Sequence, residues 1–312
     1  MDDLIDLVIV GGGAAGMGAA QYGARANLRT VLLEEMAPGG QALLIDKLEN
    51  YPGLPAPVDG YTWTETMRNQ AEEFGAEIRS TSVSSIRKDG KAFIIDTSDG
   101  PVRAKAVILA TGAKHRHLDV PGEETFAGRG VSYCATCDGP FFKGKPMLVV
   151  GGGDAACDEA MFLSKLADKI IMVHRKDRFR AQKALADRVL ANPKIEMRWN
   201  TVVDEIVGSR AVEKVRLKNL QSGQLSEETV AAVFVFVGSI PQTGSIDESI
   251  ARDESGSIIT NDRMETSLPG LYAVGDVRAT PFRQVVTAVS DGAVAAHCAA
   301  QYIDELEGHS YI

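Results

Sequence analysis

The 312-residue sequence contains no run of 18 or more apolar residues, so no segment has the length and hydrophobicity of a membrane-spanning helix. Its first residues, MDDLIDLVIVGGG, are acidic where a secretory signal would be basic. Four cysteines are too few for a disulfide scaffold in a chain of this length. We therefore expect a cytoplasmic protein with no membrane partner, in which a Cys-x-x-Cys pair is catalytic or binds a metal.

The sequence also contains fewer basic than acidic residues. The 33 lysines and arginines are outnumbered by 42 acidic residues, which gives a formal net charge of −9. This balance argues against a broad nucleic-acid surface, and we expect no nucleic-acid partner. The hydrophobic content of 45% is that of a globular protein, and the length favours two domains, each with its own core.

A dinucleotide-binding pattern stands at the start of the chain. Residues 6–10 form a short apolar strand that leads into GGGAAG, an alanine-rich helix and a second strand, TVLLE, which ends at Glu34. In this pattern Gly11 permits the tight turn, Gly13 lets the backbone approach a pyrophosphate, and Gly16 lets the helix pack closely on the strand. The start of the helix supplies N–H groups that attract the anion.

The same pattern recurs in PMLVVGGGDAACDEAMFLSKL, with Gly151, Gly153 and, at the third site, Ala156. The strand that follows, KIIMVH, ends in the basic run HRKDRFR. An acid such as Glu34 suits a ribose hydroxyl, whereas a basic cluster around Arg175 suits a 2′-phosphate. The sequence thus predicts an FAD-type site first and an NADPH-type site second, with a solvated helix start as the plainer alternative for the basic run.

The order of the motifs predicts a divided domain. A third strand pattern, GLYAVGDV, ends at Gly275 and Asp276, where the aspartate would bind a flavin ribitol hydroxyl or simply cap the next helix. The backbone at Gln284 and Val285 would start that helix near the flavin ring. We expect an α/β fold with two Rossmann-like domains: a discontinuous FAD domain, 1–114 and 243–312, and an NADPH domain, 115–242, joined through GAKHRHLDVPGE and GSIPQTGS.

The stretch VSYCATCDGPFF contains Cys134 and Cys137, and Asp138 follows at once. Zinc would normally need four ligands, so we expect no metal site, while Cys157 and Cys298 sit singly in helical stretches that favour buried, inert thiols. A helical turn brings the paired sulfurs together, which indicates a dithiol that cycles. Asp138 would serve it as acid and base with a raised pKa; an ordinary turn aspartate is the alternative.

A protein disulfide partner would need exposed aromatic surface near the dithiol. Phe141 and Phe142 follow the pair and Arg129 precedes it, although two adjacent phenylalanines more often belong to a core. One flavin face cannot serve a nicotinamide, a disulfide and a protein partner together. We therefore expect the middle domain to rotate on its two linkers between half-reactions.

Taken in order, GGGAAG, PGGQ, ENYPG, ATGA, RGVSYCATCDG, GGGDAACDEA, HRKDRFRA and GLYAVGDV followed by RQ resemble the low-molecular-weight, bacterial-type thioredoxin reductases. The resemblance implies a homodimeric flavoprotein that takes hydride from NADPH and reduces thioredoxin through a Cys134–Cys137 disulfide, with Cys137 nearer the flavin. Three features depart from the family pattern: Ala14 replaces a proline, Lys176 replaces a second arginine, and residues 56–66 replace a plainer loop.

The resemblance also implies the cofactor-binding positions. For FAD these are Gly11, Gly13, Ala14, Ala15, Gly16, Glu34, Gly40, Gln41, Asn50, Val83, Thr111, Gly112, Gly275, Asp276, Arg283, Gln284 and Val285. For NADPH they are Gly151, Gly153, Asp154, Ala155, Glu159, His174, Arg175, Lys176 and Arg180. The rival interpretations are a flavin-dependent reductase or dithiol oxidase of the same fold with another partner and, from a different class, a non-catalytic nucleotide-sensing or zinc-stabilised binding protein.

Overall fold

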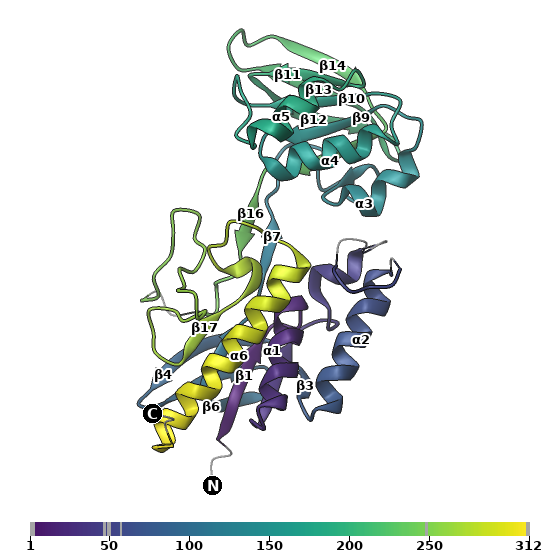
Figure 1. The fold of residues 1–312 in the computed structure, drawn as a ribbon. Helices are drawn as coiled ribbons and strands as arrows, with labels where there is room; N and C mark the ends of the chain where they lie inside the picture. Colours follow the sequence, from purple (N-terminus) through teal and green to yellow (C-terminus); the bar gives the residue numbers. More distant parts are fainter. Residues whose placement is uncertain (1–3, 46–47, 49–50, 57, 247–248, 310–312) are drawn as a thin grey trace. The chain divides into compact units, whose positions relative to one another are not determined.

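The computed structural model of the chain describes residues 4–45, 48, 51–56, 58–246 and 249–309, without the side chains of Leu44 and Cys137. The chain forms two compact units (Figure 1). Unit 1 comprises Met1–Lys114 and Ile240–Ile312, and unit 2 comprises His115–Ser239. The two connections run side by side, because strand β7 (Ala113–His115) pairs with strand β16 (Ser239–Pro241).

The second connection lies three residues earlier than the 242/243 boundary expected from the sequence. Gln242 belongs to unit 1, where its backbone N–H donates to the carbonyl of Gly112 at 2.9 Å. Its side-chain Nε2 donates to the carbonyl of Thr111 at 2.7 Å, and the Thr111 hydroxyl donates back to the carbonyl of Gln242 at 2.6 Å. These three bonds hold residue 242 against the segment that follows a unit 1 strand ending at Leu109. Residue 242 therefore belongs to unit 1 and not to unit 2.

Unit 1 is built on a seven-stranded sheet in the order β3-β2-β1-β6-β5-β4, with β17 also paired to β6. Strand β6 is long enough for both neighbours, because its first half pairs antiparallel with β5 and its second half parallel with β17. The elements are β1 (Ile5–Val10), α1 (Ala14–Arg25), β2 (Thr30–Glu34), η1 (Gly40–Leu44), α2 (Gly60–Glu73), β3 (Glu77–Ser80), β4 (Val83–Asp89), β5 (Ala92–Thr97), β6 (Gly100–Leu109), β17 (Leu271–Ala273), η3 (Gly275–Val277) and α6 (Val285–Glu307).

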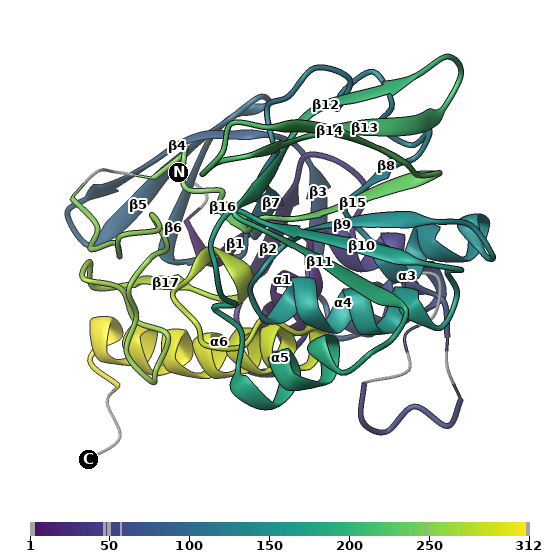
Figure 2. The ribbon, with the colours of Figure 1, turned by 90° about the horizontal axis from the view of Figure 1, so that it is seen from above.

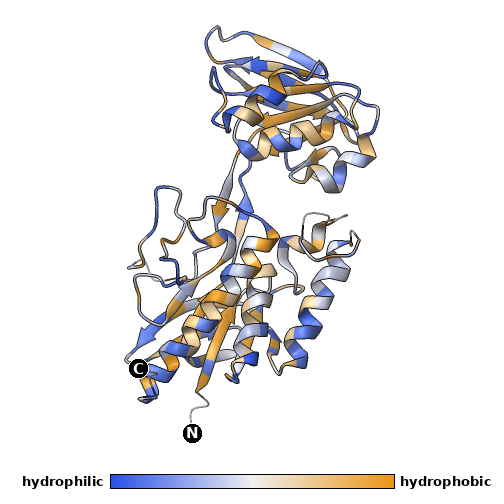
Figure 3. Cartoon of the chain, viewed as in Figure 1, coloured by the Kyte–Doolittle hydropathy of each residue, from blue (hydrophilic) through white to orange (hydrophobic). Residues whose placement is uncertain are grey.

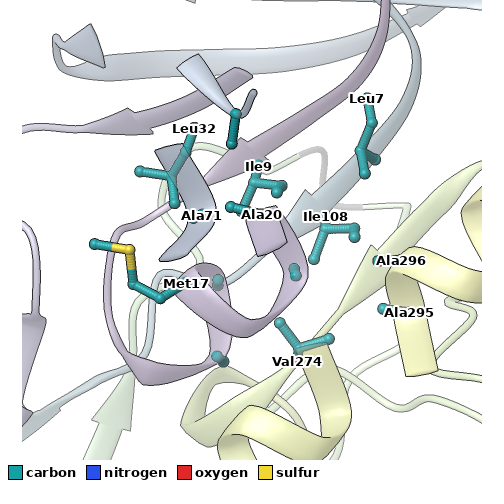
Figure 4. Packing of buried hydrophobic residues seen from close by; sticks show 14 of the residues in the cluster. Leu7, Ile9, Met17, Ala20, Leu32, Ala71, Ile108, Val274, Ala295 and Ala296 are labelled. Carbon is teal, nitrogen blue, oxygen red and sulfur yellow. The ribbon is translucent and has the colours of Figure 1, made fainter. Parts of the chain in front are cut away.

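Alternating strand residues of unit 1 pack against different layers. Leu7, Ile9 and Ile108 face helices α1, α2 and α6, in a buried cluster that also contains Met17 and Ala296 (Figure 4). The residues between them in sequence form a second core with β4, β5 and the segment around β17. A sheet buried on both faces is typical of a Rossmann-like unit.

Unit 2 contains a parallel five-stranded sheet, β11-β10-β9-β15-β8, and an antiparallel three-stranded sheet, β12-β13-β14. Its elements are β8 (Val131–Ser132), α3 (Ala135–Asp138), η2 (Gly139–Phe142), β9 (Met147–Gly151), α4 (Asp154–Ser164), β10 (Ile170–His174), α5 (Lys183–Leu190), β11 (Ile195–Trp199), β12 (Thr201–Gly208), β13 (Val212–Asn219), β14 (Leu225–Thr229) and β15 (Ala232–Phe236).

The parallel sheet of unit 2 lies between helices and the antiparallel sheet (Figure 2). Met147 and Val149 of β9 face the core shared with α4, whereas Leu148 and Val150 face the core shared with β12 and β13. Figure 3 shows the central strands of each unit as predominantly hydrophobic. The expected α/β fold, with two Rossmann-like units of which the first is discontinuous, is therefore confirmed.

Among the residues that the structure describes, no helix is both long and apolar enough to cross a membrane.

Candidate functional site

The first glycine turn lies between β1 and α1. Gly11 has φ +104°, a backbone conformation that other residues rarely adopt, and a side chain on Gly16 would overlap the carbonyl oxygen of Gly11. Gly13 is the N-cap of α1 and makes no side-chain capping bond, and a Cβ built on it would meet nothing within 4 Å. The open backbone at this helix start, followed by Ala14 and Ala15, fits a pyrophosphate.

Glu34 ends β2 beside this turn. Its Oε2 accepts the N–H of Gly12 at 2.5 Å, and its Oε1 accepts the N–H of Met36 at 2.8 Å. The carbonyl of Gly12 accepts the N–H of Gly39 at 2.7 Å, which brings η1 to the same turn. The carboxylate therefore stands where the sequence pattern placed it, at the edge of the glycine turn, as a dinucleotide ribose requires.

The remaining unit 1 candidates mostly follow the carboxyl ends of parallel strands. Strands β1, β2, β6 and β17 run in the same direction, so the residues after them gather at one edge of the sheet. Thr111 and Gly112 follow β6, and Gly275 and Asp276 form η3 after β17. Gly40 and Gln41 begin η1, whereas Val83 begins β4, and Asn50 lies outside the described residues. This edge is where open α/β sheets bind their ligands.

The start of helix α6 decides whether Asp276 caps that helix, which was the alternative to binding a flavin ribitol hydroxyl. The N-cap of α6 is Gln284, which forms a capping box with Thr287, so Asp276 is not the cap of this helix. Gly275 is held by its N–H, which donates to Asp291 Oδ2 at 3.1 Å, and the same oxygen pairs with Arg278 at 3.1 Å. Arg283 precedes the cap and Val285 begins the helix. The capping role is therefore excluded, and the ribitol role of Asp276 remains a prediction.

The second glycine turn, between β9 and α4, has the same form. Gly153 is the N-cap of α4 without a side-chain capping bond, and a Cβ on it would have only Arg180 Nη2 nearby, at 4.0 Å. The segment after β10 closes on this turn, because the N–H of Arg180 donates to the carbonyl of Gly152 at 2.7 Å. Asp154 Oδ1 accepts the N–H of Gln182, also at 2.7 Å. The structure thus brings Arg180 to an open helix start.

The basic segment after β10 is solvent-accessible. Arg175, Lys176 and Arg180 are exposed, and His174 is partly buried beside Phe179. Burial, and next the charge of Arg175, lower the pKa of His174 below its usual value, so the imidazole is neutral near pH 7. Its Nε2 is buried and has no hydrogen-bond partner among the described residues. Exposed guanidinium groups beside an open glycine turn fit a phosphorylated dinucleotide.

Glu159 lies one helical turn beyond this glycine turn, after Asp154 and the exposed Ala155. Burial, and then the charge of Asp158, raise the pKa of Glu159 to about 7. The carboxyl group is therefore protonated in a large fraction of molecules near neutral pH. A neutral carboxyl group at this position would not repel a nucleotide phosphate.

We expect the stability of the protein to fall as the pH rises from about 5 to 8 partly because of Glu159. The folded state holds this proton up to about pH 7, whereas the unfolded chain releases it near the ordinary glutamate pKa of 4.5. Glu159→Gln should therefore be more stable than wild type at pH 8, by roughly 1–3 kcal/mol, and nearly equal to it at pH 5. Urea unfolding at both pH values measures this difference. Glu124→Gln, at an exposed glutamate, is the control, and an equal gain at both pH values would contradict the assignment.

The redox segment follows β8 in unit 2. Cys134 is disulfide-bonded, and the side chain of Cys137 lies outside the described part of the chain. The N–H of Cys134 donates to the Ser132 hydroxyl at 3.0 Å, and that hydroxyl donates to the carbonyl of Cys134 at 3.1 Å. The Thr136 hydroxyl lies 3.5 Å from Cys134 Sγ and is the donor, because a bonded sulfur carries no hydrogen. Asp138 ends α3, and its N–H donates to the carbonyl of Cys134 at 3.2 Å.

The other cysteines have no part in this segment. Cys157 and Cys298 are free and buried, and burial raises the pKa of Cys157 to about 12. Such a thiol carries almost no thiolate near pH 7 and is inert. Within the described residues, no group of three or more His, Cys, Asp or Glu side chains could hold a metal ion.

The phenylalanines after the dithiol do not share one environment. Phe141 is 77% exposed, whereas Phe142 is partly buried and packs edge-on against Phe234, with the ring centroids 6.4 Å apart. Of the two alternatives predicted for these rings, Phe141 is thus the exposed ring and Phe142 the core ring. The reason is that consecutive side chains of the 3-10 helix η2 point in different directions, and only that of Phe142 points toward the core of unit 2.

Sequence reasoning missed several polar residues around the dithiol. Ser132 and Thr136 contact Cys134, and Tyr133 is bonded to Glu123 and His117. The spacing of the hydroxyl residues around Cys134 was a visible signal, since residues two positions away in a turn can bond its backbone. Nothing in the sequence linked Glu123 to Tyr133, because the nine intervening residues must first fold.

Comparisons with known proteins agree with this arrangement. The family model described as pyridine nucleotide-disulphide oxidoreductase matches residues 5–292. A thioredoxin reductase from Treponema pallidum (strain Nichols) is 53% identical over 307 residues, covering 98% of this chain and 100% of the relative. The thioredoxin reductase of Peptoclostridium acidaminophilum is 43% identical, covering 97% of this chain and 98% of the relative.

A solved structure shows the same fold. The crystal structure of thioredoxin reductase from Lactococcus lactis, in the FR conformation, is 41% identical with a TM-score of 0.83, covering 96% of this chain and 99% of that one. Together with two open glycine turns and a bonded Cys-x-x-Cys cysteine, these matches establish a flavoprotein oxidoreductase that uses FAD and NADPH. The chain belongs to the pyridine nucleotide-disulphide oxidoreductase family, as a member of its low-molecular-weight thioredoxin reductase group.

Proposed function

We propose that this chain reduces the disulfide of thioredoxin with electrons from NADPH, through a redox-active disulfide between Cys134 and Cys137. The observation that carries the proposal is the bonded state of Cys134 in a unit that also contains the basic glycine turn. A dithiol oxidase of the same fold would have no use for that basic turn. The names of the most similar relatives support thioredoxin as the substrate.

The open turn at Gly13 and the carboxylate of Glu34 would hold the adenosine and pyrophosphate part of FAD, with the strand-end residues of unit 1 around the rest. Gly153 and Arg180 would hold the pyrophosphate of NADPH, and Arg175 with Lys176 its 2′-phosphate. When bound, FAD accepts hydride from NADPH and supplies two electrons to a disulfide.

The dithiol chemistry then belongs to residues of unit 2. Once the Cys134–Cys137 bond is reduced, the Cys134 thiolate attacks one sulfur of the substrate disulfide, and the departing sulfur takes a proton. Cys137 next attacks Cys134 Sγ, which re-forms the internal disulfide and releases the second substrate thiol. Asp138, next in sequence to Cys137, would hold and return the proton at its carboxylate. The Thr136 hydroxyl, 3.5 Å from Cys134 Sγ, would stabilise the thiolate.

A disulfide that takes electrons from a flavin and then reacts with a protein substrate must contact the two in turn. We therefore propose that unit 2 rotates relative to unit 1 about the paired connections β7 and β16. Two short strands are the whole covalent link between the units, which permits such a motion.

We also infer that the chain acts as a homodimer in the cytoplasm. The sequence resemblance supports both statements, and unit 1 presents exposed aromatic rings, Tyr22 on α1 and Phe74 at the C-cap of α2, that a second copy could cover. Light scattering of the purified protein would show the mass of one or of two chains.

The proposal is tested by anaerobic titration of the purified protein with NADPH, followed by addition of oxidised thioredoxin. We expect flavin absorbance that bleaches with NADPH and returns with thioredoxin. Colourless protein, or bleaching that thioredoxin does not reverse, would contradict the proposal. The same assay with the two units covalently crosslinked tests the rotation, and undiminished steady-state reduction would exclude it.

Replacing Phe141 by alanine should raise the KM for thioredoxin about 5- to 20-fold, because an exposed aromatic ring near the reacting sulfur is a typical contact for a protein partner. Reduction of a small aromatic disulfide should be unchanged. Leu190→Ala, which removes an exposed apolar side chain elsewhere in unit 2, is the matched control. Phe142→Ala should instead destabilise the protein by about 2–4 kcal/mol, since its ring is packed. Equal losses for thioredoxin and the small disulfide in Phe141→Ala would argue against docking there.

A further inference from the structure

Unit 2 contains a buried carboxylate that the proposed chemistry does not use. Glu123 is 2% exposed and lies in the segment that enters unit 2 from the first connection. Its Oε1 and Oε2 both accept the N–H of Leu118, each at 2.9 Å, and Oε2 also accepts the N–H of Asp119 at 2.8 Å. Asp119 has φ +58°, a conformation that these bonds help to hold. The carboxylate therefore fixes the backbone just after the connection.

The same carboxylate reaches the residue that precedes Cys134. The Tyr133 hydroxyl donates to Glu123 Oε1 at 2.8 Å and lies 2.8 Å from His117 Nδ1. A phenol has one hydrogen, and Glu123 receives it, so the bond with His117 must be donated by its Nδ1–H. Burial, and then the bond to Glu123, raise the pKa of Tyr133, which keeps the hydroxyl protonated near neutral pH.

Aromatic contacts reinforce these bonds. The ring of His115 stacks on Tyr133 with centroids 5.6 Å apart and planes 15° apart, and the ring of His117 is tilted at 5.0 Å. Tyr133 itself packs on the core between the two sheets of unit 2. The N–H of Arg116, between the two histidines, donates to the carbonyl of Gly238 at the second connection, at 2.9 Å.

We propose that Glu123, Tyr133 and His117 form a linker clasp that joins the connection between the units to the redox segment, and that Tyr133 and Glu123 are positioning residues for turnover. The proposal rests on the proposed disulfide reductase function and its domain rotation. Tyr133 and Cys134 are joined by a peptide bond. Because His115 and His117 of the first connection hold the ring of Tyr133, they also fix the direction in which the chain enters the redox turn. A rotation at β7 and β16 is then transmitted to the redox segment as a rigid motion instead of being absorbed by a loose connection.

Tyr133→Phe tests the clasp, because it keeps the stacked ring and removes only the hydroxyl. We expect amide hydrogen exchange in residues 116–119 to become about tenfold faster, and kcat for thioredoxin reduction to fall about three- to tenfold with an unchanged KM for NADPH. His117→Phe, which keeps an aromatic ring and removes both ring nitrogens, including the Nδ1 donor to Tyr133, should change both in the same direction. The matched control is Tyr272→Phe in unit 1, which removes a buried hydroxyl bonded to the carbonyl of Cys298 at 3.2 Å. It should lower Tm comparably and leave kcat and exchange in 116–119 unchanged.

The outcomes separate this inference from the proposed function. Exchange in residues 116–119 that is the same in Tyr133→Phe and wild type would overturn the clasp, whether or not the protein reduces thioredoxin. Faster exchange with unchanged kcat would overturn the role in turnover. A wild-type protein that reduces no thioredoxin would refute the proposed function, and with it the role in turnover, while the exchange comparison would still decide whether the clasp exists.

Discussion

Replacing Cys134 by serine should lower thioredoxin reduction by roughly a thousandfold or more, because a hydroxyl cannot form the mixed disulfide that exchange requires. The bound flavin should still bleach with NADPH, since that half-reaction does not involve Cys134. Stopped-flow absorbance and a coupled thioredoxin assay on the same preparation measure the two effects. The contrast between them assigns the defect to the dithiol.

Cys298→Ala is the matched control for this substitution, because Cys298 is a free, buried cysteine of unit 1. It should retain near wild-type reduction. Cys137→Ser is expected to accumulate a covalent complex between Cys134 and thioredoxin, which intact-mass spectrometry would detect, since the resolving sulfur is missing. More than a tenth of wild-type activity in Cys134→Ser would show that another group carries the electrons.

The double substitution Arg175→Ala with Lys176→Ala should reduce the preference for NADPH over NADH by roughly 150-fold or more, because the loss of two charge-assisted bonds costs about 3 kcal/mol or more. Each charge-assisted bond to a 2′-phosphate contributes roughly 1.5–3 kcal/mol, and NADH carries no such phosphate. We therefore expect the KM for NADPH to rise by this factor and the KM for NADH to change little. Steady-state kinetics with each coenzyme measures the ratio directly.

Arg188→Ala serves as the control, because it removes an exposed positive charge from α5 of the same unit without touching the segment after β10. It should alter neither KM by more than about twofold. If the double substitution weakened both coenzymes equally, the two side chains would contact a part of the coenzyme common to NADPH and NADH. The single substitution Lys176→Ala should show a smaller effect than Arg175→Ala, because lysine cannot bind a phosphate bidentately.

Much of the fold could be predicted from short patterns. The strand, glycine turn and helix at residues 5–25 and at 147–164 are present as expected, because the conformation at Gly11 and the close packing at Gly16 depend on local backbone geometry. The long helix before the C-terminus was equally clear from its alanine-rich, apolar composition. Such signals act over a few residues, so they can be read from a single sequence.

Contacts between residues far apart in the sequence were harder to predict from it. The position of Gln242 depends on hydrogen bonds to Thr111 and Gly112, more than 100 residues earlier in the sequence. Unit 2 therefore ends at residue 239, whereas the sequence pattern predicted residue 242. The different surroundings of Phe141 and Phe142 also depend on folding, because only packing against Phe234 separates them. The assignment of individual side chains to FAD or NADPH remains a prediction.

Residue types and spacing alone were enough to indicate two nucleotide turns, their order, the basic cluster after the second and a cysteine pair with an adjacent aspartate, since each of these is encoded within one short segment. Burial, charge environment and long-range bonding required the folded chain. Folding raises the pKa of Glu159, gives His174 a neutral ring and joins Glu123 to Tyr133 and His117. The physical reason is that desolvation and hydrogen bonding depend on which surfaces meet, and a linear pattern does not contain that information.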